Sequence, residues 1–458
     1  MRKIILDSFI DSDTDEKFLG SIAFTKGNKG LLLEKNGHII LLSIEHINSL
    51  LKHKIPQNLV QKLKSRGFIY DNNIIEKCDM FCQIKPDFFM IDITNKCNMH
   101  CKYCLRNIDI LNNSIDENKI RDICDYINEY CEKENLLDVS IQPWGGEPLL
   151  ELKSILLLRK HIFPQKTNVH FTIETNGLLL CEQMIDKLYD NKIGIGISID
   201  GFESVHNAQR TLWSGDGTHN IVEHNLLLAQ KKYGDRLGTI TTITKNNAGY
   251  VEEILEYFAC ELNLKSVKFN FVHKSMFSGC DDLCLSNEEI SKTEIKILNK
   301  IIELNKRGYY ISEYNIKVKL KNLLFKQYSD ICHSNGCNGG RKMIVFDMEG
   351  RIYPCELTDT PDESIGSIYD EISLIDIISD ATKNRDYFID KKDKVCNNCE
   401  WYVYCKGGCT VRVINSEKRP PAIDDVECSV NSVLYPALVE LILSKPDVVN
   451  RILNNNVL

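Results

Sequence analysis

The chain has 458 residues, of which 43% are hydrophobic and 26% are charged. This length exceeds what one hydrophobic core usually supports, so two or three domains are expected. The formal net charge of −8 argues against a nucleic-acid partner, because phosphate contacts favour a basic surface. Charge enters the first residues too early for a secretory signal, and no apolar run approaches the length that crosses a bilayer. We therefore expect a cytoplasmic protein with no membrane partner.

Nineteen cysteines are the most unusual feature of the composition. The chain is long, has no secretory signal and has an odd cysteine count, which together argue against a disulfide framework. In a reducing compartment, clustered cysteines indicate metal binding or catalysis. Eight of them fall between Cys332 and Cys428, in a segment with few apolar residues. We expect metal to hold that segment in shape.

Residues 1–85 are expected to form a small separate unit. Short strand-like runs are followed by two short helical patterns and a last strand, with turn residues between them. This order predicts a winged-helix-like module. The strands are expected at 21–24, 30–33, 38–42 and 67–70, and the helices at about 43–53 and 57–65.

Residues 86–285 alternate strand and helix, with six strand candidates. Repeated βα units with β-branched strands predict a parallel sheet, here a partial (β/α)6 barrel in an α/β fold. A helical bridge at 286–331 and a cysteine-rich domain with a C-terminal helix at 332–458 complete the predicted architecture. The strands are expected at 88–93, 139–142, 169–173, 194–199, 238–244 and 267–272, and the helices near 116–134, 151–163, 181–190, 218–233 and 248–262.

Polar and glycine-rich residues follow the first five predicted strands. In barrels of this kind the chemistry lies in the loops at the C-terminal strand ends. The pattern therefore predicts an active-site rim. The rim segments are 94–104, 143–148, 174–177, 198–201 and 244–247.

Three cysteines in the first rim loop carry the strongest chemical signal. Cys97, Cys101 and Cys104 have three and then two residues between them. Three thiolates from one loop hold three irons of a [4Fe–4S] cluster and leave the fourth iron open to the amino and carboxylate groups of a small molecule. A zinc site with a distant fourth ligand is the alternative, although this loop position suits no common zinc module.

With this motif the chain resembles the radical S-adenosylmethionine (SAM) superfamily over about residues 86–273. The resemblance implies a SAM-binding [4Fe–4S] cluster on these cysteines and a 5′-deoxyadenosyl radical as the reactive species. It places Tyr103 near the adenine, the Gly145–Pro148 loop near the methionyl amino group, and Arg210 near the carboxylate. Taken alone, Gly-Gly-Glu-Pro is also a plain turn and Arg210 a surface charge. The implied SAM-binding residues are Tyr103, Gly145, Gly146, Glu147, Pro148, Thr175, Asn176, Ser198, Asp200 and Arg210.

A second cysteine constellation lies in the C-terminal part. Twelve residues separate Cys337 from Gly350 and four more precede Cys355; a C-x2-C-x5-C-x3-C run and, eighteen residues on, Cys428 follow. This spacing resembles the SPASM extension, named for subtilosin, pyrroloquinoline quinone, anaerobic sulfatase and mycofactocin maturation. The resemblance implies two auxiliary [4Fe–4S] clusters, three clusters in all. One would take Cys332, Cys337, Cys355 and Cys409, and the other Cys396, Cys399, Cys405 and Cys428. Two structural zinc ions are the alternative.

The remaining cysteines have simpler interpretations. Two pairs lack further ligands nearby and are expected in linkers: Cys78 with Cys82, and Cys280 with Cys284. Four others lie in helical patterns and are expected to fill core space: Cys124, Cys131, Cys181 and Cys260. Trp144 is interpreted either as a packing residue or as part of the cofactor pocket.

SPASM enzymes mostly modify peptides or proteins, so the resemblance implies a polypeptide substrate and an external one-electron reductant such as flavodoxin or ferredoxin. The N-terminal module resembles the leader-recognition elements of ribosomal-peptide maturases, which add a peptide strand to a sheet edge. We therefore expect a maturase that crosslinks a ribosomally made precursor peptide through a thioether or carbon–carbon bond.

Two alternatives are weighed against this expectation. An anaerobic sulfatase-maturating enzyme, which forms formylglycine, has an aspartate base directly after the cysteine that corresponds to Cys355. This chain has Glu356 there, and glutamate is a candidate for the same catalytic role. A non-catalytic electron carrier or zinc scaffold is the alternative of another class, and it does not explain the Gly145–Pro148 loop.

Overall fold

The computed structural model describes most of the chain. Cys78 and Cys82, expected in a linker, lie outside the described residues. The described ranges are 1–12, 16–34, 36–70, 85–106, 112–272, 280–327, 330–332, 336–358, 361–384, 394–415 and 423–454.

The N-terminal module is built on a four-stranded antiparallel sheet. Its elements are β1 (Arg2–Leu6), β2 (Phe9–Ile10), β3 (Lys17–Phe18), β4 (Ser21–Lys26), β5 (Lys29–Glu34), β6 (Ile39–Ser43), α1 (Ile44–Leu51), α2 (Val60–Ser65) and β7 (Ile69–Tyr70). The strand order is β1-β4-β5-β6, and a smaller sheet has the order β2-β3-β7. Ser43 begins α1 as its N-cap, its hydroxyl accepting the N–H of His46. The expected strands and helices are confirmed, whereas β1, β2 and β3 were not foreseen.

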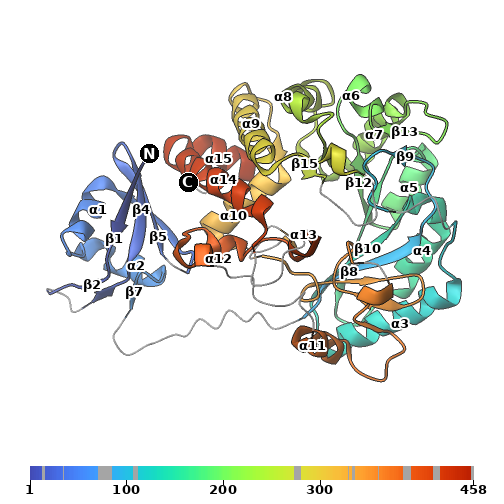
Figure 1. Cartoon of the computed structure of the whole chain (residues 1–458), viewed down its shortest axis with the longest axis horizontal. Helices are drawn as coiled ribbons and strands as arrows, with labels where there is room; N and C mark the ends of the chain where they lie inside the picture. Colours follow the sequence, from blue (N-terminus) through green and yellow to red (C-terminus); the bar gives the residue numbers. More distant parts are fainter. Residues whose placement is uncertain are drawn as a thin grey trace.

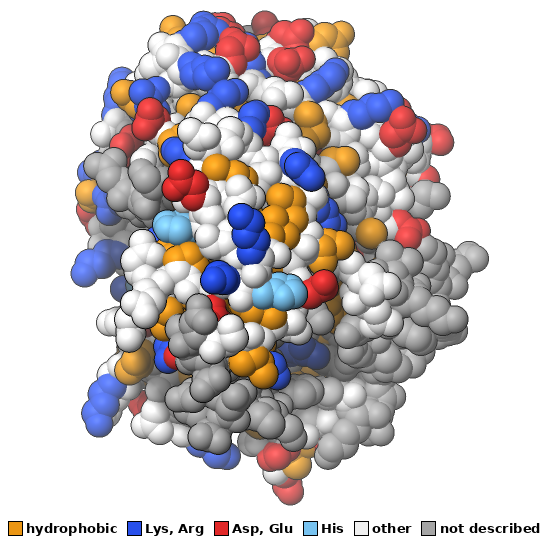
Figure 2. Space-filling model, turned by 90° about the vertical axis from the view of Figure 1, so that its left-hand side faces the viewer, with side chains coloured by type: hydrophobic (Ala, Val, Ile, Leu, Met, Phe, Trp, Pro, Cys, Tyr) orange, Lys and Arg blue, Asp and Glu red, His pale blue; other side chains and the backbone are white. Residues whose placement is uncertain are grey.

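The outward face of this module mixes apolar and basic side chains. Figure 2 shows lysine, arginine and histidine side chains lying among hydrophobic ones on this side of the molecule. Ile5 on β1 and Ile10 on β2 are 70% and 58% exposed. Among the strands that the structure describes, β1 pairs only with β4, so it is an edge strand of its sheet.

The six parallel strands of the barrel are confirmed. The elements are β8 (Phe88–Thr94), α3 (Glu117–Lys133), β10 (Asp138–Gly145), α4 (Leu152–His161), β11 (Asn168–Thr175), α5 (Glu182–Asp190), β12 (Ile193–Ser198), α6 (Glu203–Asn207), α7 (His219–Tyr233), β14 (Gly238–Ile243), α8 (Val251–Glu256) and β15 (Ser266–Phe271). Burial alternates along the strands: in β11, Phe171 and Ile173 are buried in the main core, while Thr172 is exposed. One face of each strand therefore packs under the helices, and the other faces the lumen.

The remaining elements follow the barrel in sequence. They are α9 (Asn287–Lys306), β16 (Ser312–Glu313), α10 (Tyr314–Phe325), β17 (Met343–Phe346), β18 (Arg351–Tyr353), β19 (Gly366–Ser367), α11 (Leu374–Asn384), α12 (Tyr402–Cys405), α13 (Thr410–Asn415), α14 (Asp425–Ser444) and α15 (Pro446–Leu453). By length and composition α14 could span a membrane, contrary to the expectation that no apolar run is long enough. More than half of that stretch is buried, and α14 packs against α9, α15, β4 and β5.

The barrel sheet is larger than predicted. In the described part of the chain it has ten strands, in the order β16-β15-β14-β12-β11-β10-β8-β17-β18-β19. β17 comes from the cysteine-rich region and pairs in parallel with β8, Met343 opposite Phe88. Ile344 and Phe346 are fully buried in the main core. The short apolar run of the cysteine-rich region thus extends the barrel sheet, a support that the sequence did not predict in addition to the expected metal.

The N-terminal module docks on the cysteine-rich region. In Figure 1 it lies at the left, with α10, α12 and α14 between it and the barrel. The ring of Phe24 on β4 stacks on Trp401 with centroids 5.5 Å apart, and Trp401 stacks on Tyr435 of α14 at 5.2 Å. The Tyr404 hydroxyl donates a hydrogen bond to the carbonyl of Gly37 (3.0 Å). The N-terminal module thus packs directly against the core of the C-terminal region.

Phe24→Ala tests this contact. Phe24 is 3% exposed, so its removal leaves a cavity beside Trp401 and should lower the free energy of unfolding by about 3–5 kcal/mol. Urea unfolding followed by tryptophan fluorescence measures the change. The matched control is Phe163→Ala, because Phe163 is 68% exposed and its loss should change stability by less than about 0.5 kcal/mol. Equal stability of the two variants would show that packing of the module against the C-terminal region does not stabilise the protein.

Candidate active site and cluster sites

The three-cysteine loop leaves β8 at the rim of the barrel. It contains β9 (His100–Cys101), which pairs with β13 (Arg210–Thr211) so that Arg210 lies opposite Cys101. The backbone N–H of Met99 donates to the Cys97 thiol (3.5 Å), and that of Cys104 donates to the Cys101 carbonyl (3.1 Å). The loop is therefore folded back on itself, with its three thiols inside.

The three thiols influence one another electrostatically. Burial raises the pKa of Cys97 to about 12, and Glu147 and the other two thiols contribute to this rise. Burial also raises the pKa of Cys101 to about 11, against the opposing charge of Arg210. Within the described residues, no three Cys, His, Asp or Glu side chains converge on the site of a single metal ion. The thiols lie close enough to affect one another's pKa, as three ligands of one cluster would.

The glycines of the Gly145–Pro148 loop let two backbones meet. The N–H of Gly146 donates to the carbonyl of Thr94, and the N–H of Glu147 donates to that of Lys96, both at 2.8 Å. A Cβ on Gly145 would lie 2.0 Å from the Thr94 oxygen, and one on Gly146 would lie 2.2 Å from the Lys96 oxygen. Gly145 also has a φ of +145°, which favours glycine. The close approach that these glycines allow is therefore to the cysteine loop itself.

Glu147 joins this loop to the next rim segment. Its carboxylate is 1% exposed and accepts hydrogen bonds from the Thr175 hydroxyl (2.7 Å), the Asn176 N–H (2.7 Å) and the Leu149 N–H (3.0 Å). Burial raises the pKa of Glu147, and these donors oppose the shift. The Asn176 side-chain amide in turn donates to the side chain of Asn98 (2.7 Å). The second and third rim loops and the cysteine loop therefore form one hydrogen-bonded unit.

Tyr103, Asp200 and Arg210 form a buried polar group beside the cysteines. The Tyr103 hydroxyl donates to Asp200 (2.7 Å) and accepts from Arg210 (2.6 Å). The other oxygen of Asp200 accepts the N–H of Thr242 (3.0 Å), so Asp200 supports Tyr103 from behind. The buried Nε of Arg210 has no hydrogen-bond partner among the described residues. That free donor beside Cys101 fits the carboxylate of a bound ligand.

The other predicted rim residues lie where the sequence placed them. Pro148 begins a buried 3-10 turn after Glu147, and Ser198 ends β12 on its lumen side. Whether Ser198 and Asp200 contact a cofactor stays a prediction.

The eight C-terminal cysteines fall into two groups. In the first group each thiol lies in the electrostatic field of others of the same set. The second group lines a single cavity of about 60 Å³. The first group is Cys332, Cys337, Cys355 and Cys409, and the second is Cys396, Cys399, Cys405 and Cys428. These are the two sets that the SPASM resemblance implies.

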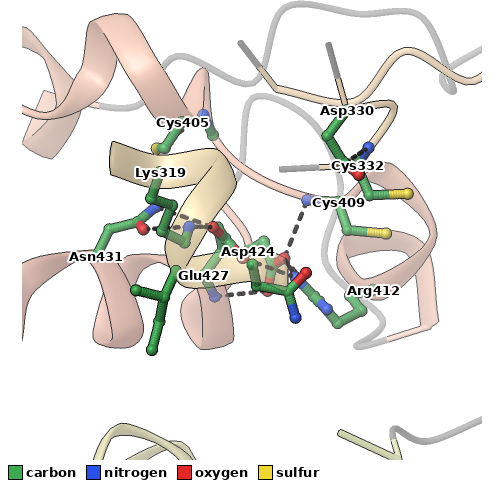
Figure 3. A network of polar contacts seen from close by, with 12 residues as sticks. Lys319, Asp330, Cys332, Cys405, Cys409, Arg412, Asp424, Glu427 and Asn431 are labelled. Atoms are coloured by element: carbon green, nitrogen blue, oxygen red, sulfur yellow. Dashed lines mark hydrogen bonds and ion pairs between the residues drawn. The ribbon is translucent and has the colours of Figure 1, made fainter. Parts of the chain in front are cut away.

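A buried carboxylate links the two groups (Figure 3). Asp424 accepts hydrogen bonds from the N–H of Cys409 (3.0 Å) and from Arg412 (2.7 Å), and it caps α14 by accepting the N–H of Val426 (3.1 Å). Since α14 carries Cys428, one side chain positions a ligand loop of the first group and the helix of the second.

Sequence reasoning missed Trp213. Its indole N–H donates to the carbonyl of Cys97 (3.0 Å), and its ring stacks on His100 with centroids 4.5 Å apart. Trp213 therefore braces the cysteine loop from the solvent side, half exposed. No motif marks it, because the contact joins the loop to a segment more than a hundred residues away.

Two cysteine expectations were wrong. Cys280 and Cys284, expected in a linker, are buried beside Tyr103, because the chain after β15 returns to the rim and packs there. Cys181, expected to fill core space, is exposed because it precedes α5 as its N-cap. The core positions of Cys124 and Cys131 in α3 are confirmed, and Cys260 packs partly buried against the same core.

Family models match both halves of this arrangement. The model described as "Radical SAM superfamily" matches residues 91–258, and the SPASM model, described as "Iron-sulfur cluster-binding domain", matches residues 337–400. The chain belongs to the radical SAM superfamily. It is a radical SAM enzyme of the SPASM type, whose cofactors are SAM and [4Fe–4S] clusters. In this radical SAM enzyme the three cysteine groups described above would hold the clusters.

Curated relatives agree with this assignment. The chain is 27% identical over 334 residues to the cysteine-type anaerobic sulfatase-maturating enzyme of Clostridium perfringens, an alignment that covers 68% of this chain and 85% of the relative. It is 21% identical over 369 residues to the radical SAM cyclopropyl synthase TigE of Paramaledivibacter caminithermalis, covering 76% and 73%.

Two solved structures share the fold. Native anSMEcpe with bound AdoMet matches with a TM-score of 0.65 and 22% identity, over 78% of this chain and 100% of that one. Streptococcus suis SuiB bound to precursor peptide SuiA matches with a TM-score of 0.56 and 16% identity, over 88% and 96%.

Gly146→Ala should disrupt the rim. The added methyl group would meet the Lys96 carbonyl, so the cysteine loop must move and the SAM-binding cluster should be lost or unstable. Iron analysis and 5′-deoxyadenosine formation after anaerobic reconstitution measure this. Gly249→Ala is the matched control, since nothing lies within 4 Å of a Cβ there. Wild-type cluster content and turnover in Gly146→Ala would contradict the role given to the glycine.

Cys101→Ala should abolish SAM cleavage and spare the auxiliary groups. The cysteines of the three groups are separate, so iron should fall from about twelve to about eight per chain, as expected for the loss of one four-iron cluster. Metal analysis that finds zinc in place of iron in the variant would contradict iron–sulfur clusters in the C-terminal region.

Proposed function

We propose that this radical SAM enzyme is a maturase that crosslinks a ribosomally made precursor peptide through a thioether or carbon–carbon bond. The observation that carries the proposal is the N-terminal module. Among the described strands β1 is an edge strand of its sheet, and the side of the module in Figure 2 carries basic and apolar side chains with some acidic ones between them. Such an edge accepts an added peptide strand, and alternate side chains of the peptide meet the face.

The composition of this face points to an acidic, amphipathic leader. Phe9 on β2 stacks on His53 just after α1, with ring centroids 4.9 Å apart, which places β2 beside the basic segment that follows the helix. That segment, residues 52–66, has no acidic residue, and its basic residues are Lys52, Lys54, Lys62, Lys64 and Arg66. Exposed Ile10 and Leu51 supply apolar contacts.

The chemistry would take place in the barrel lumen below the rim. Bound SAM and the clusters, reduced by an external one-electron carrier such as a flavodoxin or ferredoxin, supply a hydrogen-abstracting radical and an electron acceptor. The chain orients the reactants and excludes water from them. Arg210 and the Glu147 unit would hold SAM at the rim, and Cys332, Cys337, Cys355 and Cys409 would hold the auxiliary cluster nearer the lumen.

Maturation of a sulfatase by formylglycine formation is the second candidate. It is favoured by the 27% identity to the Clostridium perfringens enzyme and by Glu356, which directly follows Cys355. The carboxylate of Glu356 accepts a hydrogen bond from the Cys355 thiol at 3.2 Å.

Mass spectrometry distinguishes the two functions. The reconstituted enzyme is presented with the short peptides encoded beside its gene and, separately, with a cysteine-containing sulfatase peptide. A crosslink removes two hydrogens from a precursor, whereas formylglycine replaces the cysteine thiol by an aldehyde. Modification of the sulfatase peptide alone would overturn the proposed function.

Ile5→Glu tests the leader-binding face. Ile5 is on the edge strand and 70% exposed, so the charge should leave the fold intact and repel an acidic leader. We expect kcat/KM for peptide modification to fall at least about tenfold, corresponding to about 1.4 kcal/mol, while SAM cleavage without peptide is unchanged. Leu137→Glu, at a barrel position that is 74% exposed, is the matched control. Equal peptide kinetics in the two variants would contradict leader binding at this edge.

A further inference from the structure

Three glycines line one part of the barrel lumen. Gly194 and Gly196 on β12 and Gly238 on β14 alternate with buried residues, so they occupy the lumen face of their strands. A Cβ on Gly238 would meet only backbone atoms, at 3.7 Å. Thr172 and Ile240 approach the Cβ positions of Gly194 and Gly196 to 3.2 and 3.4 Å, so side chains of the neighbouring strands lie over β12.

Glu174 lies next to these glycines. It lies on the lumen face of β11, and a Cβ placed on Gly196 would be 3.7 Å from its Cγ. Among the described residues its carboxylate has no hydrogen bond and no ion pair within 4.0 Å. Burial raises the pKa of Glu174, the charge of Lys268 opposes the shift, and Glu356 adds to it. Glu174 is partly buried, so its carboxylate is still accessible from the lumen and can meet a bound substrate there.

The position of Glu174 relates it to the rim. The next residue, Thr175, donates to Glu147 and so belongs to the hydrogen-bonded unit around the cysteine loop. Glu174 is thus one residue below the place where the predicted SAM-binding residues gather.

The surroundings of Glu174 are polar on one side and apolar on the other. Lys268, on the lumen face of β15, lies 5.3 Å from the centre of the Tyr314 ring and has no ion pair within 4.0 Å in the described part of the chain. On β10, the strand next to β11, Trp144 packs against a cluster that contains Met90 and Cys355, and its buried indole N–H has no hydrogen-bond partner among the described residues. An unpaired carboxylate, an unpaired ammonium and an unpaired N–H donor therefore surround the lumen.

We propose that Glu174 is the catalytic residue that accepts the substrate proton when the new bond forms. The inference rests on the proposed function. With its cofactors bound, the enzyme would supply a radical that takes a hydrogen atom from a peptide carbon and a cluster that takes up one electron. The attacking group of the peptide would bond to that carbon and release its own proton to the Glu174 carboxylate. The charge of Lys268 favours the ionised carboxylate and opposes the effect of burial, which raises the pKa of Glu174.

Glu356 is the alternative base. Here it accepts a hydrogen bond from the Cys355 thiol, but that thiol loses its proton when it binds iron, so this contact does not exclude Glu356 from the role. The two carboxylates therefore make different predictions when each is neutralised.

The experiment compares Glu174→Gln, Glu174→Asp and Glu356→Gln in the reconstituted full-length enzyme, with exposed Glu182→Gln as the control. The probe is the precursor peptide that the wild type modifies. If the wild type modifies only the sulfatase peptide, the sulfatase peptide is the probe, because its cysteine thiol also loses a proton in the reaction. In the second case the crosslinking function fails, yet Glu174 is still tested.

We expect Glu174→Gln to lower product formation by about 10²–10⁴-fold, the usual range for losing a general base. Iron content should stay at the wild-type level, which shows that the clusters are intact, and Glu174→Asp should recover part of the activity. Product formation at the wild-type rate in Glu174→Gln would overturn the proposal. A loss of this size in Glu356→Gln alone would do the same and assign the proton to Glu356.

Discussion

The geometry of the active site depends on the hydrogen bonds that Glu147 makes. A carboxylate buried to 1% exposure is tolerated only when donors surround it, and here they come from its own loop and from the end of β11. Its backbone N–H is bound at the same time to the Lys96 carbonyl, next to Cys97. Three segments that are distant in sequence are therefore fixed relative to one another before any cofactor arrives, which reduces the entropy lost when the cofactor binds.

The same physical device recurs at the other end of the molecule. Asp424 is 3% exposed and binds backbone N–H groups of two ligand-bearing segments together with Arg412. Because it caps α14, its charge is also favoured by the helix dipole. Lys319 and Glu427, paired at 2.7 Å and both nearly buried, extend this network toward α10. In both places a buried carboxylate positions the segments that carry the cluster-binding cysteines.

Most of the barrel and its rim could be predicted from sequence, because local patterns specify them. Runs such as 193–198 alternate isoleucine with glycine or serine, and the polar residues at strand ends identify the rim without a structure. The pairing of β9 with β13, the bracing by Trp213 and the stack of Phe24 on Trp401 could not be predicted. Each joins residues over a hundred apart through one or two side chains or a two-residue ribbon, and such contacts leave no periodicity in the sequence. Glu174 belongs to a rim segment that the sequence identifies, but its lack of a hydrogen-bond partner among the described residues follows only from the fold.

The docking of the N-terminal module on α14 has a consequence for the order of folding. Lys26 pairs with Glu440 at 2.5 Å, a separation of 414 residues, and the surrounding core contains side chains from both ends of the chain. Contacts between such distant residues form late, because a very long loop must close first. The first module emerges from the ribosome long before its docking surface is synthesised. The docking face of β4 and β5 therefore stays uncovered during synthesis until α14 has been released from the ribosome.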